Sequence, residues 1–264
     1  MGDLDRVPDG VDPAVPSSAR VYDYLLGGKD NYAVDRAIAE RLLSVAPDTR
    51  SVARANRAFL ARAVRFLCEQ GITQFIDLGT GIPTSPSVHE VARETHPEAR
   101  VVYVDNDPLV KVHNDALLAT DDRVITLRAD IRRPDEIVEH PDVRALIDFD
   151  KPVGVLLVTV LHFVSDEEGA YQIVAGLRDK IVSGSYVVLS HSSSDSDPEV
   201  LTQLKASTAG SPAQSTFRSH DEILGFFEGL EIESPGLVPV QRWRPTMDSI
   251  TSRLVVEGAV ARKA

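Results

Sequence analysis

The pattern of apolar and polar positions changes about 70 residues into the chain. Before that point, apolar residues recur at steps of three and four, which is the spacing of one face of a helix. The clearest such face consists of Val52, Ala55, Phe59, Ala63 and Phe66. Pro47 separates this helix from an earlier helical stretch over residues 32–45. We therefore predict a helical segment over residues 17–70.

Beyond residue 70, short β-branched or apolar runs alternate with helical stretches. The expected strands are 72–78, 100–104, 124–128, 153–159 and 186–190. The expected helices are 85–95, 108–119 and 165–182, with a broken helical segment up to residue 147. Because strands and helices alternate, the chain should form a parallel sheet with helices on both faces.

After residue 190 the alternation stops. Two helical stretches, 198–207 and 220–227, precede two extended segments, 230–240 and 252–260, with no crossover helix between them. Such a connection implies antiparallel pairing. We predict a single α/β domain over residues 17–264, in which a helical lid (17–70) covers a Rossmann-like core (71–264). The core should be a doubly wound, mostly parallel, seven-stranded sheet that ends in an antiparallel hairpin.

The composition excludes several classes of protein. Asp and Glu number 40 against 28 Lys and Arg, and the net charge of -12 argues against a nucleic-acid binder or a polybasic membrane anchor. The single cysteine, Cys68, and histidines without metal-ligand spacing predict no metal site. Residues 1–16 are rich in Pro and Asp, so a disordered leader is expected rather than a secretory signal. No apolar run is long enough to span a bilayer, which predicts a cytoplasmic protein.

Polar residues follow four of the predicted strands. They are Asp77-Leu78-Gly79-Thr80-Gly81 after the first, Asp105-Asn106 after the second, Asp130-Ile131 after the third and His162 after the fourth. In open α/β sheets, ligands bind in the crevice at the carboxyl ends of the strands. We therefore expect a nucleotide-type site at this edge of the sheet.

The loop after the first strand favours a ligand without phosphates. Gly79 and Gly81 permit a sharp turn and a close approach of the ligand. Thr84 replaces the third glycine of a dinucleotide fingerprint, and Pro83 and Pro86 remove N–H groups that would hold a pyrophosphate. The loop therefore suits adenosine better than the dinucleotide of a nicotinamide-dependent oxidoreductase.

The acidic residues at the strand ends suit a cationic adenosine derivative. Asp105 could accept two hydrogen bonds from a ribose diol, Asp130 could accept one from the adenine amine, and Asp77 could attract an ammonium group. S-adenosylmethionine (SAM) combines these groups with a sulfonium and carries no phosphate. Taken singly, Asp105 and Asp130 could be ordinary helix caps, so the argument depends on their order along the chain.

Several longer motifs resemble a known family. They are SARVYDYLLGGKDNY (18–32), NRAFL (56–60), QFIDLGTGIPT (74–84), VVYVDNDP (101–108), LHF (161–163), GSY (184–186), SH (190–191), PG (235–236) and RWRP (242–245). Over residues 17–245 the chain resembles the actinobacterial S-adenosyl methyltransferase family, long known only as a domain of unknown function. The resemblance implies a class I methyltransferase fold with SAM as the methyl donor. It does not imply a particular acceptor.

Further candidates for the site lie in the N-terminal segment and after the fourth strand. Arg20 and Arg57 could bind the carboxylate of SAM through their guanidinium groups. Tyr24 could line the SAM pocket if the N-terminal helices close over the cofactor. The alternative is that these helices pack at the edge of the sheet. His162 could act as a general base, or it could be a hydrogen-bonded histidine in the wall.

Together these features predict a SAM-dependent methyltransferase that acts on a small-molecule acceptor. The predicted cofactor residues are Arg20, Tyr24, Arg57, Asp77, Gly79, Thr80, Gly81, Asp105, Asn106, Asp130 and Ile131. A non-catalytic regulatory module that binds SAM or adenosine would show the same strand ends, so it remains the alternative. Transfer of a labelled methyl group from SAM to an acceptor distinguishes the two.

Overall fold

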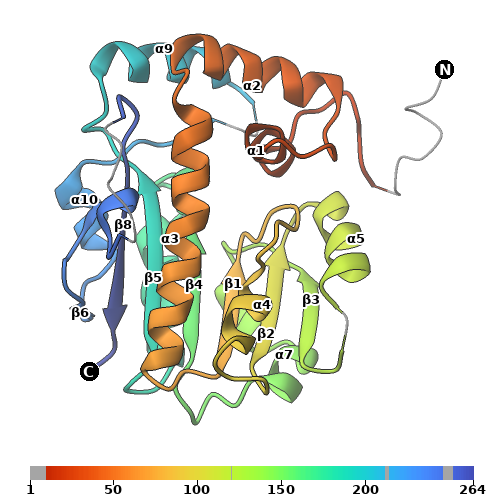
Figure 1. Ribbon diagram of the computed structural model, residues 1–264, viewed down its shortest axis with the longest axis vertical. Coiled ribbons are helices and arrows are strands. Elements are labelled where there is room, and N and C mark those ends of the chain that lie inside the picture. Colours follow the sequence, from red (N-terminus) through yellow and green to blue (C-terminus); the bar gives the residue numbers. More distant parts are fainter. Residues whose placement is uncertain (1–9, 120, 212–213, 246–251) are drawn as a thin grey trace.

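One mixed sheet, with the strand order β3-β2-β1-β4-β5-β8-β6, forms the centre of the protein (Figure 1). The structure is a computed structural model that describes residues 10–119, 121–211, 214–245 and 252–264. The strands are β1 (Gln74–Leu78), β2 (Arg100–Asp105), β3 (Val124–Arg128), β4 (Gly154–Val158), β5 (Tyr186–Ser192), β6 (Glu231–Ile232), β7 (Val238–Pro239) and β8 (Val256–Arg262). Strands β1 to β5 are parallel, whereas β8 is antiparallel to β5, β6 and β7.

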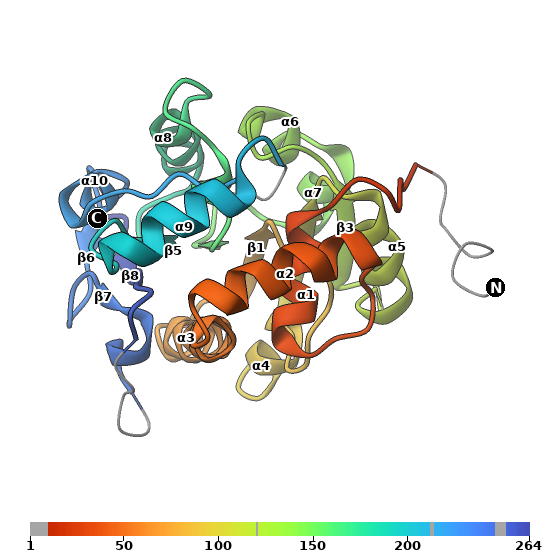
Figure 2. The ribbon, with the colours of Figure 1, turned by 90° about the horizontal axis from the view of Figure 1, so that it is seen from above.

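Helices cover both faces of the sheet and its carboxyl edge. They are α1 (Ser18–Leu26), α2 (Ala33–Val45), α3 (Thr49–Glu69), α4 (Val88–Arg93), α5 (Pro108–Leu117), α6 (Pro134–Val138), α7 (Pro141–Leu146), α8 (Ala170–Lys180), α9 (Pro198–Thr208) and α10 (His220–Gly225), with short 3-10 turns η1 (Leu161–Phe163) and η2 (Val240–Arg242). Helices α3 and α4 lie on one face, and α6, α8 and α10 lie on the other (Figure 2). Helices α1, α2 and α9 lie across the carboxyl ends of the strands (Figures 1 and 2).

The order of the strands places a switch point between β1 and β4. Strand β1 pairs with β2 on one side and with β4 on the other, and it is buried along its whole length. The chain winds outward from β1 to β3 and then from β4 to β5 in the opposite direction. The loops after β1 and β4 therefore diverge and leave a crevice between them.

The apolar face predicted for the third helix packs against the sheet and against η2. Phe59 and Phe66 both contact the ring of Trp243 edge-on, with ring centroids 5.5 and 5.9 Å apart. Arg62 of the same helix donates hydrogen bonds to the carbonyl groups of Val240 and Trp243. This contact anchors the C-terminal segment to the helix that begins at the crevice.

The alternation of strands and helices is confirmed, and so is the antiparallel pairing at the end of the chain. The prediction of seven strands is wrong for the described residues, which contain eight strands. The expected extended segment 230–240 forms two short strands, β6 and β7, because Pro235 and Gly236 (φ +95°) turn the chain between them.

Two helices also begin later than predicted. Helix α4 begins at Val88, since Ser87 and Glu90 form its capping box. Helix α8 begins at Ala170, since Gly169 adopts φ +83° just before it.

No described helix is long and apolar enough to cross a membrane. The described residues also contain no cluster of three metal-ligating side chains.

Candidate active site

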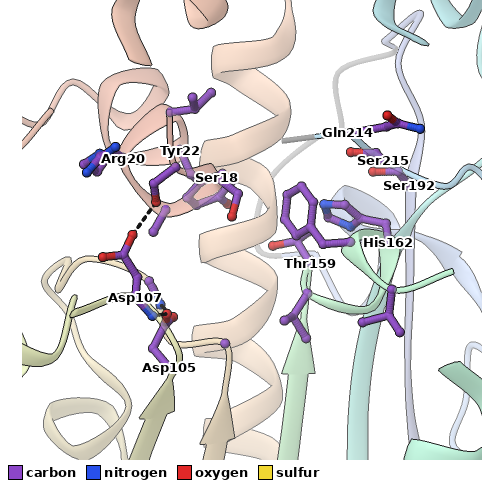
Figure 3. A pocket seen from close by; sticks show the side chains of 18 of the residues that line it. Ser18, Arg20, Tyr22, Asp105, Asp107, Thr159, His162, Ser192, Gln214 and Ser215 are labelled. Carbon is purple, nitrogen blue, oxygen red and sulfur yellow. Dashed lines mark hydrogen bonds between the residues drawn. The ribbon is translucent and has the colours of Figure 1, made fainter. Parts of the chain in front are cut away.

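A cavity of about 930 Å³ lies between the carboxyl ends of the strands and helices α1, α2 and α9 (Figure 3). Its volume is near the upper end of the range of roughly 300–1,000 Å³ for small-molecule sites, which leaves room for two molecules side by side. Its two sides differ in chemistry. In Figure 3, Arg20, Asp105 and Asp107 lie on one side, and His162, Ser192, Gln214 and Ser215 lie on the other.

We call the first side the charged half. It consists of the lining residues within 10–25, 56–57, 77–81, 105–108 and 129–132, together with Glu168. Its charged residues are Asp12, Arg20, Arg57, Asp77, Asp105, Asp107, Arg132 and Glu168. The other side is the uncharged half, which consists of the lining residues within 42–53, 158–165, 192–217 and 254–256, together with Leu60. None of the described lining residues of the uncharged half is an Asp, Glu, Lys or Arg. The ion pair of Arg132 with Glu168 lies at the boundary of the two halves, because Arg132 donates to the carbonyl of Phe163 and Glu168 accepts from the N–H of Ser165.

The loop after β1 turns sharply into the charged half. Gly79 and Gly81 adopt φ +74° and +68°, and a Cβ at Gly79 would lie 2.7 Å from Cβ of Val160. The N–H groups of Gly79 and Thr80 donate to the carbonyl of Val104, at 2.8 and 3.2 Å, and the N–H of Gly81 donates to the carboxylate of Asp105 at 2.9 Å. All three N–H groups are therefore used inside the protein. The glycine turn at residues 79–81 therefore offers no free N–H group to a pyrophosphate, which argues against a dinucleotide at this turn.

Asp105 ends β2 and lies against the glycine loop. Its two oxygens accept the N–H groups of Gly81 and Asp107, both at 2.9 Å. Burial raises the pKa of Asp105 to about 6, although these hydrogen bonds act in the opposite direction. Each carboxylate oxygen has a further lone pair, so Asp105 can still accept hydrogen bonds from a ligand.

Asp77 is the fourth residue of β1 and is also buried. Burial raises its pKa to about 7, the charge of Arg57 opposes this rise, and the charge of Asp105 adds to it. Arg57 is held in place by hydrogen bonds from Nη2 to the carbonyl groups of Thr84 and Pro86. Two buried carboxyl groups with raised pKa values favour a ligand that brings positive charge.

The N-terminal segment closes this side of the cavity. Arg20 is buried in α1, forms an ion pair with Asp35 at 2.9 Å, and donates to the carbonyl of Val15. Ser17 donates to the carboxylate of Asp107. The expected disordered leader falls outside the described residues up to residue 9. Its last part, residues 10–16, has a defined place, and five of these residues line the cavity.

His162 lies in η1, directly after β4, and lines the uncharged half. Its Nδ1 is buried without a hydrogen-bond partner. Its ring lies 4.1 Å from that of Phe163 and 5.8 Å from that of His191, measured between centroids. Burial, helped by the nearby His191 and Arg218, lowers the pKa of His162 well below its ordinary value. The imidazole is therefore neutral at neutral pH.

A buried arginine supports this turn from behind. Nη1 and Nη2 of Arg218 donate to the carbonyl groups of Leu161 and Val164, on either side of His162. Nε and Nη2 donate to Asp166, and Nη1 lies 2.6 Å from Nε2 of His191. Burial lowers the pKa of His191 to about 4, so its neutral ring accepts from the guanidinium. Arg218 thereby ties the turn after β4 to the end of β5.

Comparisons with known proteins agree with this geometry. The family model described as "S-adenosyl methyltransferase" matches residues 5–264. The chain belongs to the S-adenosyl methyltransferase family. A DUF574 family protein from Streptomyces avermitilis is 40% identical, with a TM-score of 0.92 over 96% of this chain and 99% of the other. A candidate methyltransferase from Thermobifida fusca is also 40% identical, with a TM-score of 0.91 over 97% and 98% of the two chains.

More distant structures share the fold. The N-methyltransferase NodS from Bradyrhizobium japonicum, solved with S-adenosyl-L-homocysteine, is 11% identical, with a TM-score of 0.52 over 92% of this chain and 98% of that one. No protein of curated function matches the chain. The family is that of SAM-dependent methyltransferases, so this protein is an enzyme that uses SAM as its methyl donor.

The cavity of this methyltransferase contains most of the residues predicted from the sequence. Those that line it are Arg20, Arg57, Asp77, Gly79, Thr80, Gly81, Asp105, Asn106, Ile131 and His162. Tyr24 and Asp130 do not line it. The Tyr24 ring lies under Arg50 and its hydroxyl donates to Glu40, whereas Asp130 pairs with Arg132.

The loop over residues 27–31, within the motif 18–32, has a structural role. The carboxylate of Asp23 accepts hydrogen bonds from the N–H of Asp30 and the side chain of Asn31, at 3.0 and 2.8 Å. The loop therefore closes on the end of α1, and none of its residues lines the cavity.

Sequence reasoning missed a hydrogen-bond network where the two halves of the cavity meet. Nδ2 of Asn56 donates to Tyr22 and Thr159, both at 3.1 Å, and its Oδ1 accepts from Ser190 at 2.7 Å. Thr159 has φ +53°, in the left-handed region. Such strain persists where the surroundings hold it, and it clusters at functional sites. The signals in the sequence were the motifs that contain Tyr22 and Asn56, and the position of Thr159 at the end of the predicted strand 153–159.

Proposed function

We propose that this methyltransferase binds SAM in the charged half and transfers its methyl group to a small-molecule acceptor in the uncharged half. The observation that carries the proposal is the pair of buried carboxyl groups, Asp77 and Asp105, beside a glycine loop whose N–H groups are already used. Such a surface suits a phosphate-free cation. SAM supplies an activated methyl group on a positively charged sulfur.

Different residues of the charged half bind different parts of SAM. Asp105 accepts hydrogen bonds from the ribose diol, with Asn106 and Ile131 beside the adenosine, and Gly79, Thr80 and Gly81 allow its close approach. Asp77 attracts the ammonium group, and Arg20 and Arg57 bind the carboxylate. The acceptor then approaches from the uncharged half, where His162 takes up its proton. The protein's main contribution is the alignment of the two reacting atoms.

Calorimetry and labelled methyl transfer test this proposal together. Wild-type protein should bind SAM, and Asp105→Asn should bind it about 10–100-fold more weakly, because a charge-assisted hydrogen bond contributes about 1.5–3 kcal/mol. Asp150→Asn, at an exposed position at the opposite edge of the sheet, is the matched control and should leave the affinity unchanged.

Methyl-labelled SAM is then incubated with the protein and a small-molecule extract. A labelled small molecule supports the proposal. Tight binding of SAM without any labelled product favours the regulatory module. Equal affinities for SAM in wild type and Asp105→Asn would contradict the placement of the donor.

A further inference from the structure

We infer that the acceptor is an uncharged alcohol or phenol whose hydroxyl donates a hydrogen bond to Nε2 of His162, so that the product is a methyl ether. The inference rests on the proposed function, because it names the class of molecule that the uncharged half receives. Three observations support it. They are the chemistry of the lining, the accessibility of the two ring nitrogens of His162, and the partners that already occupy every N–H group of Arg218.

The first support is the lining of the uncharged half. Its described polar groups are the hydroxyl groups of Ser and Thr, the amide of Gln214 and the imidazole of His162. In Figure 3, Ser192, Ser215 and Gln214 lie on the same side of the cavity as His162. An ionised acceptor would lose its hydration there, which is costly. The nearest charged lining residues, Arg132 and Glu168, already form an ion pair with each other at 2.8 Å, so they offer little counter-charge. An uncharged molecule with hydroxyl groups can match this surface.

The positive charge of the donor does not call for an anionic acceptor. The charged half already contains five carboxyl groups, on Asp12, Asp77, Asp105, Asp107 and Glu168, against the three guanidinium groups of Arg20, Arg57 and Arg132. The donor's charge is therefore balanced on its own side of the cavity.

The second support is the accessibility of the two nitrogens of His162. Nδ1 is shielded from solvent and has no hydrogen-bond partner, so Nε2 is the ring nitrogen that a bound molecule can reach. Nε2 forms no hydrogen bond with the described part of the protein. A neutral imidazole offers one donor and one acceptor. A hydroxyl that donates to Nε2 selects the tautomer with its proton on Nδ1.

The third support is that the buried cation behind His162 has no free hydrogen-bond donor. Arg218 is 1% exposed, and its five N–H groups are matched by five contacts, two with Asp166 and one each with Leu161, Val164 and His191. An acceptor carboxylate therefore cannot be bound by this guanidinium. Since Arg218 also keeps a positive charge close behind His162, it disfavours an ammonium group at the same place.

The transfer balances with these groups alone. The acceptor oxygen forms a bond to the methyl carbon while the bond between that carbon and sulfur breaks, and the electron pair stays on sulfur. The hydroxyl proton passes to Nε2 of His162 and then to water. The products are a methyl ether, S-adenosylhomocysteine and a proton.

The experiment identifies the bond that carries the labelled methyl group. The intact protein is incubated with methyl-labelled SAM and a metabolite extract of Streptomyces avermitilis, the source of the DUF574 protein that is 40% identical. Methyl esters release labelled methanol in base, and methylated amines move into acid. Methyl ethers do neither, but hot hydriodic acid releases their methyl group as iodomethane, whereas a methyl group on carbon stays in place. The label should be stable in base, stay out of acid and be released as iodomethane. His162→Phe should lower the transfer about 100-fold or more and leave the affinity for SAM within threefold. His140→Phe, at a partly exposed histidine outside the cavity, is the control.

A binding measurement covers the case in which a variant fails to fold. Wild-type protein saturated with S-adenosylhomocysteine is titrated with 2-naphthol, 2-naphthoate and protonated 2-naphthylmethylamine, which are similar in size. The naphthol should bind at least tenfold more tightly than either ion. Labelled ester or amine, or equal binding of an ionic probe, overturns this inference and leaves the proposed function intact. Absence of any labelled product, despite SAM binding, overturns both.

Discussion

The two halves of the cavity are built from different parts of the chain and in different ways. The charged half is formed mainly by short loops that directly follow β1, β2 and β3, and by α1. The uncharged half combines the turn after β4 and a few residues of α2 and α3 with parts that come late in the chain, which are α9 and the lining residues 211, 214–217, 254 and 256. The first half offers carboxylates and guanidinium groups, and the second offers hydroxyl, amide and imidazole groups on an apolar wall.

This difference separates the role of the fold from that of the particular sequence. A methyl donor common to a family requires the same loops at the same strand ends, whatever the acceptor. The acceptor site is formed by connecting segments, which tolerate change more readily than the sheet does. Variants in one half should therefore leave the function of the other half intact.

The largest expected effect comes from the buried cation behind the uncharged half. Arg218→Met should destabilise the protein by about 3–5 kcal/mol, because it leaves buried carbonyl groups and His191 without their donor. Chemical denaturation measures this loss. The affinity for SAM, measured by calorimetry well below the melting temperature, should stay within threefold. A loss of SAM binding greater than tenfold would show that the two halves are coupled.

The charged half offers a matched pair of glycine variants. Gly79→Ala should cost about 2–4 kcal/mol of stability and abolish SAM binding, because the new Cβ would overlap Val160 at a positive φ. Gly81→Ala has a similar φ but no atom within 4 Å of its Cβ, so it should cost only about 1–2 kcal/mol. Thermal unfolding and calorimetry provide the two readouts. Equal losses for both variants would mean that φ alone matters and that contact with Val160 does not.

The same difference explains which parts of the site could be predicted. Asp77 and Asp105 were predictable, because each stands where an apolar run ends and so must lie at the carboxyl edge of a parallel sheet. Tyr24 and Asp130 were not, because the side of α1 that faces the cavity and the turn after β3 depend on packing that one sequence does not reveal. The uncharged half brings together Thr159, His162 and lining residues from α9 and from 254 and 256, which no spacing in the sequence connects.

A smaller effect concerns the pH dependence of SAM binding. Burial holds the pKa of Asp77 at about 7 and that of Asp105 at about 6, and a cationic ligand favours their ionised forms. SAM should therefore bind about tenfold more weakly at pH 5.5 than at pH 8, and its binding near pH 6.5 should release protons. Calorimetry in two buffers with different ionisation enthalpies measures this release. Uptake of protons would contradict the assignment.

Asp77→Asn provides the control for this pH dependence. The folded state raises the pKa of Asp77 from its unfolded value of about 3.9, so its contribution to stability is complete below that value and is lost as the pH rises through about 7. Without SAM at pH 8, the variant should therefore be more stable than wild type by about 1–3 kcal/mol, although it binds SAM more weakly. A less stable variant would show that the ionised Asp77 is already well accommodated.

The smallest expected effect tests the boundary of the charged half. Tyr24→Phe removes a hydroxyl that donates to Glu40 outside the cavity, and Asp130→Asn removes a charge that pairs with Arg132. Neither variant should change the affinity for SAM more than about twofold. Surface interactions of this kind contribute at most about 1 kcal/mol to stability, and neither side chain lines the cavity. A loss greater than fivefold for Tyr24→Phe would mean that α1 rotates when SAM binds and brings this face inward. The charged half would then be completed by movement of the N-terminal helices, whereas the position of Asp105 at the end of β2 would remain unchanged.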